Sequence, residues 1–365
     1  MIRPAPAIEA IPPMTPFIGP EQLMRETGRS SLVRLGANES SFGPSPRAVE
    51  AMASELPRIS WYGDPESFAL REALAAKHAC RIEEIVVGSG IDELMGLVVR
   101  AYVSPGAAAL TTRGSYPTFN YHVSGYGCRL VTADYCDDGN VDLDALAAAA
   151  KRESAALVYL ANPDNPSGTF VGTADLVRFL DALPGNTLVM LDEAYADFVP
   201  QGDLMPLRLD ERLIRMRTFS KAYGMAGARI GYAVAPQTTM QTLQKIRLHY
   251  GVNRNAQIGA VASLADDAFR AYVVEETSRA RQDYYRIARD VGLHALESLT
   301  NFVCIDCGSA ARATRVMDEL LQRGVWIRKP GAAPLDRYVR VSAGTPEMRR
   351  AFEGAFEAVL AEVVA

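Results

Sequence analysis

The chain has 365 residues, of which 48% are hydrophobic and 22% are charged, and its formal net charge is −5. That length can bury a large core and suggests two domains rather than one. An acidic chain without a lysine-rich block is atypical of nucleic-acid-binding proteins, and no apolar run of about eighteen residues is present that would span a membrane. We therefore expect a cytoplasmic protein that binds neither nucleic acid nor a membrane.

The N-terminal twenty residues contain six prolines. This excludes the helical apolar core of a secretory signal and predicts an extended arm laid over a surface. We expect the arm to comprise residues 1–32. A large domain is expected over residues 45–260, and a smaller domain over residues 33–44 together with residues 261–365.

The middle of the chain alternates short β-rich runs with helical patterns, which is typical of an α/β fold with a mostly parallel sheet. Residues 84–102 predict a strand, a glycine turn and a helix in which Leu94, Leu97, Val98 and Ala101 recur at helical spacing. Further strands are predicted in AALVYLANPDNPSGTF, NTLVMLDEAYADF and LIRMRTFSKAYG. We expect a three-layer α/β sandwich in the large domain.

The last hundred residues predict a smaller α+β domain. A pattern near 266–295 indicates a long connecting helix, and a strand at 301–306 and a helix near 311–323 follow it. The remaining predicted elements are strands near 325–328 and 337–342 and a closing helix from about 346.

Polar residues stand at the ends of four of the predicted strands, where ligands bind in open α/β sheets. GSGIDE, residues 88–93, places two glycines before a helix, so its backbone amides favour an anion there. A plain N-terminal turn is the alternative; a dinucleotide fingerprint is disfavoured because Glu93 replaces its third glycine. NPDNPSG, residues 162–168, is a rigid loop, either a simple turn or a frame from which Asn165 offers its amide to a ligand.

The next two strand ends carry ionisable groups. Asp192 ends a strand in LDEAY, with Tyr195 three residues on, and a carboxylate there is costly without a cationic partner. In RTFSKAYGMAGARIGY, Lys221 lies between apolar runs, where burial lowers the pKa of an amine and favours its nucleophilic form. Thr218, Ser220 and Arg229 suit a phosphate. An amine, a carboxylate, an amide, a phenol and phosphate ligands together are what pyridoxal phosphate requires.

No metal site is expected. Cys304 and Cys307 form a C-x-x-C without a second ligand pair, so we expect them in a buried strand rather than in a zinc site. His78, His122 and His294 have no acids at metal-ligand spacing and are interpreted as surface or core residues.

The chain resembles the fold-type I pyridoxal-phosphate aminotransferases, and within them the histidinol-phosphate aminotransferase family. The resemblance covers nearly the whole length, in the family's order and spacing. The motifs that carry it are LGANESSFGPSP, WYGDPESFALREALA, GSGIDE, NPDNPSG, LDEAY, SKAYGMAGARIGY and YVRVSAGT. It implies a homodimeric enzyme that moves an amino group between histidinol phosphate and 2-oxoglutarate or glutamate with ping-pong kinetics.

The resemblance also implies roles toward the cofactor. Lys221 would form the Schiff base with pyridoxal phosphate and carry the proton, and Asp192 would pair with the pyridinium nitrogen. Asn165 and Tyr195 would hold the phenolic oxygen, and Phe119 would stack on the ring. The implied phosphate ligands are Gly90, Ile91, Asp92, Thr218, Ser220, Arg229 and, reaching over from the neighbouring subunit, Tyr62.

On the substrate side, the resemblance implies that Arg340 grips the α-carboxylate, that Arg328 faces the distal end and that Asn38 lies near the mouth. Phe17 stands where the family usually has a tyrosine touching the substrate phosphate, and His249 where a proline is common. These departures lie around the substrate rather than the cofactor, so they leave open an aminotransferase for phenylalanine or tyrosine. A decarboxylase of a phosphorylated amino acid, which uses similar motifs, and a non-catalytic cofactor-binding regulator are the further alternatives.

Overall fold

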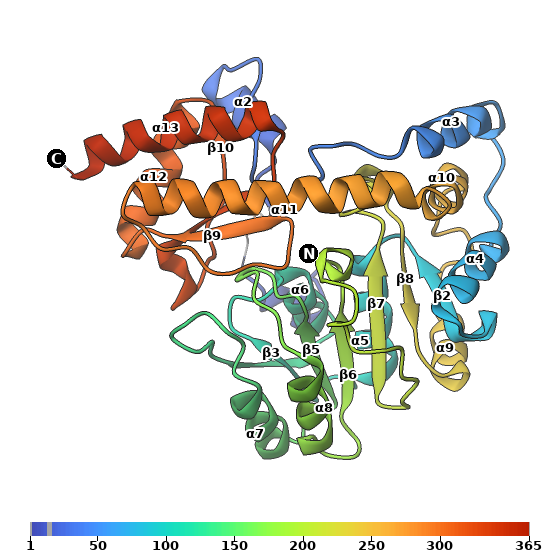
Figure 1. Cartoon of the computed structure of the whole chain (residues 1–365). Helices are drawn as coiled ribbons and strands as arrows, with labels where there is room; N and C mark the ends of the chain where they lie inside the picture. The colour runs from blue at the N-terminus through green and yellow to red at the C-terminus, as the bar shows by residue number, and fades with distance from the viewer. Residues whose placement is uncertain (1, 13–16, 365) are drawn as a thin grey trace.

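The computed structural model describes residues 2–12 and 17–364, with side chains to residue 362. A seven-stranded sheet forms its centre (Figure 1). Its order is β2-β8-β7-β6-β5-β3-β4. The strands are β2 (Ile85–Gly88), β3 (Ala108–Thr112), β4 (Arg129–Ala133), β5 (Leu157–Ala161), β6 (Leu188–Asp192), β7 (Leu213–Thr218) and β8 (Gly231–Val234). Only β8 runs antiparallel to its neighbours, β2 and β7. The expected mostly parallel sheet is confirmed.

Helices cover both faces of this sheet, which gives the expected three layers. Side chains alternate along a strand, so Tyr159 of β5 packs on one face while Val158 and Leu160 pack on the other. The first face is covered by α5 (Ile91–Tyr102), α6 (Pro117–Gly125) and α9 (Gln237–Gln244). The second is covered by α7 (Leu143–Glu153) and α8 (Thr173–Ala182).

The C-terminal elements form a second core around two short sheets. The 24-residue helix α11 (Asp267–Asp290) runs across the molecule to reach it (Figure 1). The other elements there are β9 (Phe302–Asp306), α12 (Ala310–Gln322), β10 (Val325–Trp326), β11 (Tyr338–Ser342) and α13 (Pro346–Val364). β9 pairs antiparallel with β11, and β1 (Val33–Arg34) pairs parallel with β10, which brings an early segment into this core. The division of the chain into domains at residues 32, 44 and 260 stays a prediction.

Two expectations for these elements have clear outcomes. The strand expected near 325–328 is shorter, because β10 ends at Trp326 and Arg328 makes only an isolated bridge to Arg340. Cys304 lies within β9 as predicted, whereas Cys307 follows the strand directly; the predicted burial is confirmed for both.

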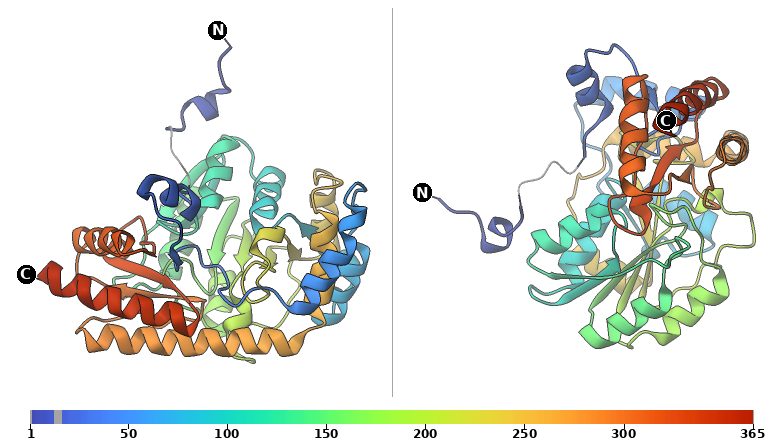
Figure 2. Two further views of the ribbon diagram at one scale, coloured as in Figure 1. Left: turned by 90° about the horizontal axis from the view of Figure 1, so that it is seen from above. Right: turned by 90° about the vertical axis from the view of Figure 1, so that its left-hand side faces the viewer.

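The N-terminal arm is not uniformly extended, which corrects the expectation. It contains α1 (Pro6–Glu9) and α2 (Pro20–Thr27), each with proline in its first turn, where the missing N–H and the fixed φ suit a helix. Figure 2 shows the segment with α1 standing away from the second core, and α1 contacts α6.

Three helices pack together at the β2 edge of the sheet, namely α3 (Pro46–Glu55), α4 (Phe68–His78) and α10 (Arg254–Leu264) (Figure 1). The 3-10 turns are η1 (Leu56–Arg58), η2 (Ile82–Glu84), η3 (Ala196–Phe198), η4 (Ala226–Ala228) and η5 (Leu335–Arg337). Within residues 2–12 and 17–364, no helix has the length and apolar character needed to cross a membrane.

Candidate active site

A cavity of about 510 Å³ opens beyond the carboxyl ends of β5, β6 and β7. That is where an α/β sheet of this topology binds its ligands, and the volume suits a cofactor or small molecule. The predicted site residues that line it are Phe17, Asn38, Ile91, Asp92, Asn165, Asp192, Tyr195, Thr218, Ser220, Lys221, Arg229, Arg328 and Arg340.

Lys221 enters the cavity from the turn after β7. Its Nζ donates a hydrogen bond to the Asn38 carbonyl at 3.0 Å and lies 5.6 Å from the centre of the Tyr195 ring. The pKa of this amine is lowered to about 8, mainly by burial and also by the nearby Arg340, while Asp192 acts in the opposite direction. The turn needs Gly224, because φ there is +66° and a Cβ would collide with the Gly43 carbonyl.

Asp192 is the last residue of β6 and is almost completely buried. Its Oδ2 accepts a hydrogen bond from the Tyr159 hydroxyl at 2.8 Å, and its Oδ1 accepts one from the Ala194 N–H at 2.9 Å. Desolvation raises the pKa of this carboxyl to about 6, while the two hydrogen bonds act in the opposite direction. Sequence reasoning missed Tyr159; the available signal was one hydroxyl inside the apolar strand β5.

One end of the cavity is built for an anion. Ile91 and Asp92 form the first turn of α5, and the free N–H groups of a first helical turn can donate hydrogen bonds to an anion. Arg229 Nη2 pairs with Asp92 Oδ2 at 3.1 Å, and the Thr218 and Ser220 hydroxyls lie 2.9 Å apart. Gly90 does not line the cavity, but φ there is +86° and a Cβ would come 2.7 Å from Arg229 Nη2.

Phe119 and Tyr62 do not lie on the cavity wall. Phe119 is fully buried and stacks on Tyr159, with ring centres 5.0 Å apart, because a ring without a hydroxyl fits the apolar core between α6 and the sheet. The aromatic residue that lines the cavity here is Tyr116, which donates a hydrogen bond to Asp92 Oδ1 at 3.0 Å. Tyr62 is 74% exposed and stacks on Tyr250 at 4.3 Å.

Two arginines lie side by side at the other end of the cavity. The backbone N–H of Arg340 bonds to the Arg328 carbonyl at 2.6 Å, which aligns the two residues. Arg340 donates to Asn165 Oδ1 at 2.6 Å and stands 5.2 Å from the Phe302 ring centre. The guanidinium of Arg328 lies 4.6 Å from the centre of the Phe17 ring. Lys329 also lines this end and was missed, although it follows Arg328 directly in the sequence.

The loop that carries Asn165 is held by a buried carboxyl. Asp164 accepts hydrogen bonds from the Tyr135 hydroxyl at 3.1 Å and from the Ser167 N–H and hydroxyl at 3.0 and 2.7 Å. Desolvation raises the pKa of Asp164 to about 6. These bonds set the path of the loop and so fix where Asn165 meets Arg340.

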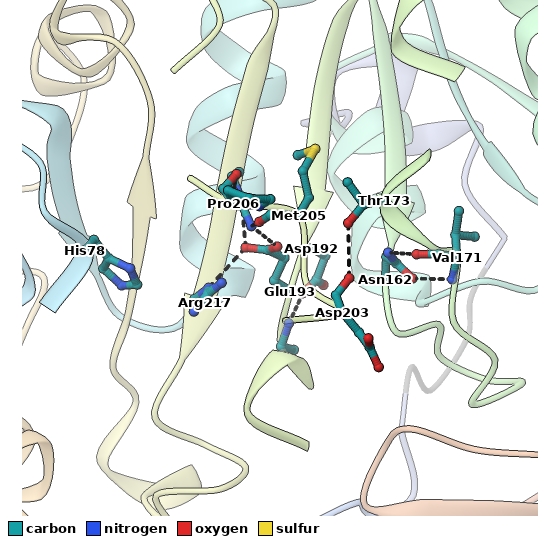
Figure 3. Close-up of polar contacts among 12 residues, drawn as sticks. His78, Asn162, Val171, Thr173, Asp192, Glu193, Asp203, Met205, Pro206 and Arg217 are labelled. Atoms are coloured by element: carbon teal, nitrogen blue, oxygen red, sulfur yellow. Dashed lines mark hydrogen bonds and ion pairs between the residues drawn. The ribbon is translucent and has the colours of Figure 1, made fainter. Parts of the chain in front are cut away.

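A buried ion cluster lies behind Asp192. Figure 3 shows the ion pair between Glu193 and Arg217 next to Asp192 at the end of β6. Arg215 also donates to both oxygens of Glu193, and its remaining N–H groups bond to the carbonyls of Met205 and Pro206 at 2.8 Å. The Glu193 and Arg215 side chains are each 3% exposed. The cluster therefore anchors the strand end that presents Asp192.

Glu193→Gln should lower the free energy of unfolding by about 3–5 kcal/mol, because it leaves two arginines facing a neutral group in the interior. Urea unfolding followed by circular dichroism measures the change. Glu153→Gln is the matched control: Glu153 also pairs with two arginines, Arg129 and Arg152, but at the surface, so little change is expected. Equal losses of unfolding free energy in both variants would show that the buried cluster stabilises the protein no more than the surface pairs do.

Comparison with known proteins agrees with this geometry. Residues 30–354 match the family model for class I and II aminotransferases. The histidinol-phosphate aminotransferases of Roseiflexus castenholzii and Geobacillus thermodenitrificans are 36% and 34% identical to this chain. Each comparison covers 95% of this chain and 95% of the relative. The crystal structure of histidinol-phosphate aminotransferase from Sinorhizobium meliloti in complex with pyridoxal-5′-phosphate has a TM-score of 0.95 at 44% identity, covering 100% of this chain and 99% of that one. This chain therefore belongs to the class I and II aminotransferase family, and within it to the group that contains the histidinol-phosphate aminotransferases.

Proposed function

We propose that this protein is a pyridoxal-phosphate-dependent aminotransferase that exchanges an amino group between histidinol phosphate and 2-oxoglutarate or glutamate. The observation that carries the proposal is that the Lys221 amine and the Asp192 carboxylate line one cavity, with an anion-binding helix end between β2 and α5. The relatives and the structural neighbour that bear the histidinol-phosphate name support the substrate.

The groups on the cavity wall fit the cofactor. The first turn of α5, Thr218, Ser220 and Arg229 would hold its phosphate, and the missing Cβ of Gly90 leaves room for that arginine. Asn165 and Tyr195 would bond to its phenolic oxygen. Asp192 would accept a hydrogen bond from the protonated ring nitrogen, which would give this buried carboxyl a cationic partner.

When bound, pyridoxal phosphate supplies an aldehyde carbon that bonds to amines and a protonated ring that withdraws electrons. Lys221 would move the proton: its neutral amine would take a proton from the substrate α-carbon, and the resulting ammonium would donate it to the carbon that the cofactor's aldehyde supplies. The pKa of about 8 leaves a useful fraction of the amine neutral near physiological pH. Arg340 and Arg328 bind the anionic group of the substrate and keep the α-carbon within reach of that amine.

The cations at the distal end favour a phosphorylated or doubly negative substrate. Arg328, Lys329 and Arg340 all line the cavity there, and arginine binds phosphate and carboxylate oxygens through paired N–H groups. Phe17 is the observation that favours the second candidate, an aminotransferase for phenylalanine or tyrosine, because it presents an apolar ring beside Arg328.

A substrate panel separates the two candidates. With 2-oxoglutarate as acceptor, kcat/KM for histidinol phosphate should exceed that for phenylalanine by about 10²-fold, since losing one charge-assisted phosphate interaction costs about 2–3 kcal/mol. Glutamate release in a coupled assay gives both values. Phenylalanine as the better donor would favour the aromatic aminotransferase. Release of CO₂ from a phosphorylated amino acid added to the panel, without amino transfer, would favour the decarboxylase.

We also propose a homodimer in the cytoplasm, in which Tyr62 reaches the cofactor phosphate of the neighbouring subunit. Exposed apolar side chains in two segments, which meet where Tyr62 stacks on Tyr250, support this arrangement; they are Leu56, Ile59, Trp61, Tyr62 and Phe68 in the first segment, and Leu248 and Tyr250 in the second. Exposed patches of this kind mark association surfaces. Arg254 and Arg247 bond to the carbonyls of Tyr62 and Pro65, which joins the two segments of the patch.

A further inference from the structure

Asn38 has an unusual backbone for a residue with a side chain. Its φ is +54°, a left-handed conformation that non-glycine residues seldom adopt and that asparagine tolerates best. It lies between β1 and α3, is 3% exposed and lines the cavity. A strained backbone at a buried position of a reactive site often has a functional role, and the contacts of Asn38 indicate which one.

Those contacts form a hub of hydrogen bonds. The Asn38 carbonyl accepts from Lys221 Nζ and from Asn301 Nδ2, each at 3.0 Å. The side chain donates from Nδ2 to the Tyr195 hydroxyl at 3.1 Å and accepts at Oδ1 from the Ser342 hydroxyl at 3.1 Å. The backbone N–H of Asn38 bonds to that same Ser342 hydroxyl at 2.9 Å. Both ends of the Asn38 side chain are therefore bound within the protein.

We propose that Asn38 is a positioning residue: its backbone carbonyl holds the Lys221 amine whenever that amine is free, and its side chain locks this carbonyl in place through Tyr195 and Ser342. A carbonyl accepts an N–H but leaves the amine lone pair open to the cavity. The long lysine stem is flexible, so a fixed acceptor restricts where its amine lies. The inference rests on the proposed function only in taking Lys221 as the reacting amine.

The hub also joins two parts of the fold. Lys221 follows β7 of the large sheet, whereas Ser342 ends β11 and Asn301 precedes β9 in the second core. A shift of the second core relative to the large sheet would therefore move the carbonyl to which the amine is bound. Asn38 therefore links β11, the strand that carries Arg340, to the Lys221 amine through hydrogen bonds.

The hydrogen bond to the Asn38 carbonyl should affect the pKa of Lys221. A carbonyl oxygen bonded to an ammonium stabilises its charged form, so the bond opposes the burial that lowers the pKa of Lys221. Weakening the bond should lower that pKa further. The charged groups that also act on this amine are Arg340 from β11, Asp192 from β6, Asp92 from α5 and Glu39 next to Asn38.

Asn38→Gly tests the proposal, because glycine keeps the left-handed backbone but removes both side-chain anchors. In the full-length protein freed of cofactor, the pKa of Lys221 is read from the pH dependence of its acetylation, with the labelled peptide quantified by mass spectrometry. We expect the pKa to fall by about one unit, which is a tenfold increase in neutral amine at low pH. In the holoenzyme, kcat should fall about tenfold while KM for glutamate stays unchanged.

Ser342→Ala is the second test variant, because it removes two of the hydrogen bonds that fix Asn38. If Asn38→Gly does not fold, the pKa of Lys221 in Ser342→Ala tests the proposal instead. Ser154→Gly is the matched control: Ser154 also has a left-handed backbone (φ 50°) but caps α7 far from the cavity. An unchanged pKa in both test variants, or an equal shift in the control, overturns the proposal. Acetylation needs no turnover, so failure of the proposed transamination in the unmodified protein would be a separate result.

Discussion

Lys221→Ala should lower kcat for transamination by about 10⁴-fold, the upper range for removal of a general acid–base group. The loss follows from the position of this amine, which lies in the cavity and donates a hydrogen bond to the Asn38 carbonyl. The variant should still bind pyridoxal phosphate, since Thr218, Ser220, Arg229 and the first turn of α5 remain in place. Steady-state rates and equilibrium dialysis of the cofactor measure the two quantities.

Lys329→Ala is the control for that experiment. Lys329 also lines the cavity, but its amine bonds to the Asp336 carbonyl at 3.2 Å and lies at the substrate end. It should change KM more than kcat. If Lys329→Ala abolished turnover while Lys221→Ala retained it, the assignment of the reacting amine would be wrong.

Arg340→Ala should raise KM for glutamate by about 10²-fold, with a much smaller effect on cofactor affinity, because truncating one side of a buried charge pair costs about 2–5 kcal/mol. The side chain lies at the substrate end, bonded to Asn165 and packed on Phe302. Arg340→Lys should recover only part of the loss, since an ammonium cannot offer two parallel N–H groups. Initial rates against glutamate concentration give KM for each variant.

Arg337→Ala is the matched control for this second prediction. Arg337 lies three residues earlier in the chain and pairs with Asp306 at the surface, away from the cavity. Its removal should leave KM for glutamate unchanged. If Arg340→Ala changed KM for glutamate and cofactor affinity equally, Arg340 would not be the residue that binds the substrate carboxylate.

The sequence predicted the large sheet and most of the cavity because both depend on local signals. Strands such as β5 and β6 are short apolar runs, and parallel strands present their carboxyl ends at one edge. Asp192 ends β6 and Lys221 lies in the turn after β7, so their shared location follows from topology. Polar residues at strand ends therefore carried the prediction of the site.

The parts that were missed depend on contacts that no local pattern encodes. Tyr159 is one hydroxyl in an apolar strand, and only the pairing of β5 with β6 brings it to Asp192. The resemblance placed Phe119 against the cofactor ring, which stays a prediction; in the structure its ring packs on Tyr159 in the core, and Tyr116 lines the cavity. The N-terminal helices were missed because proline was interpreted as extended chain, although proline also suits a first helical turn.

The most direct measurement is to treat the full-length protein, purified with its cofactor, with borohydride and to locate the modified peptide by mass spectrometry. Reduction fixes the bond between pyridoxal phosphate and the amine that holds it. The modification should fall on Lys221 alone. A modification on another lysine, such as Lys329, or a protein that takes up no pyridoxal phosphate at all, would contradict the proposed active site.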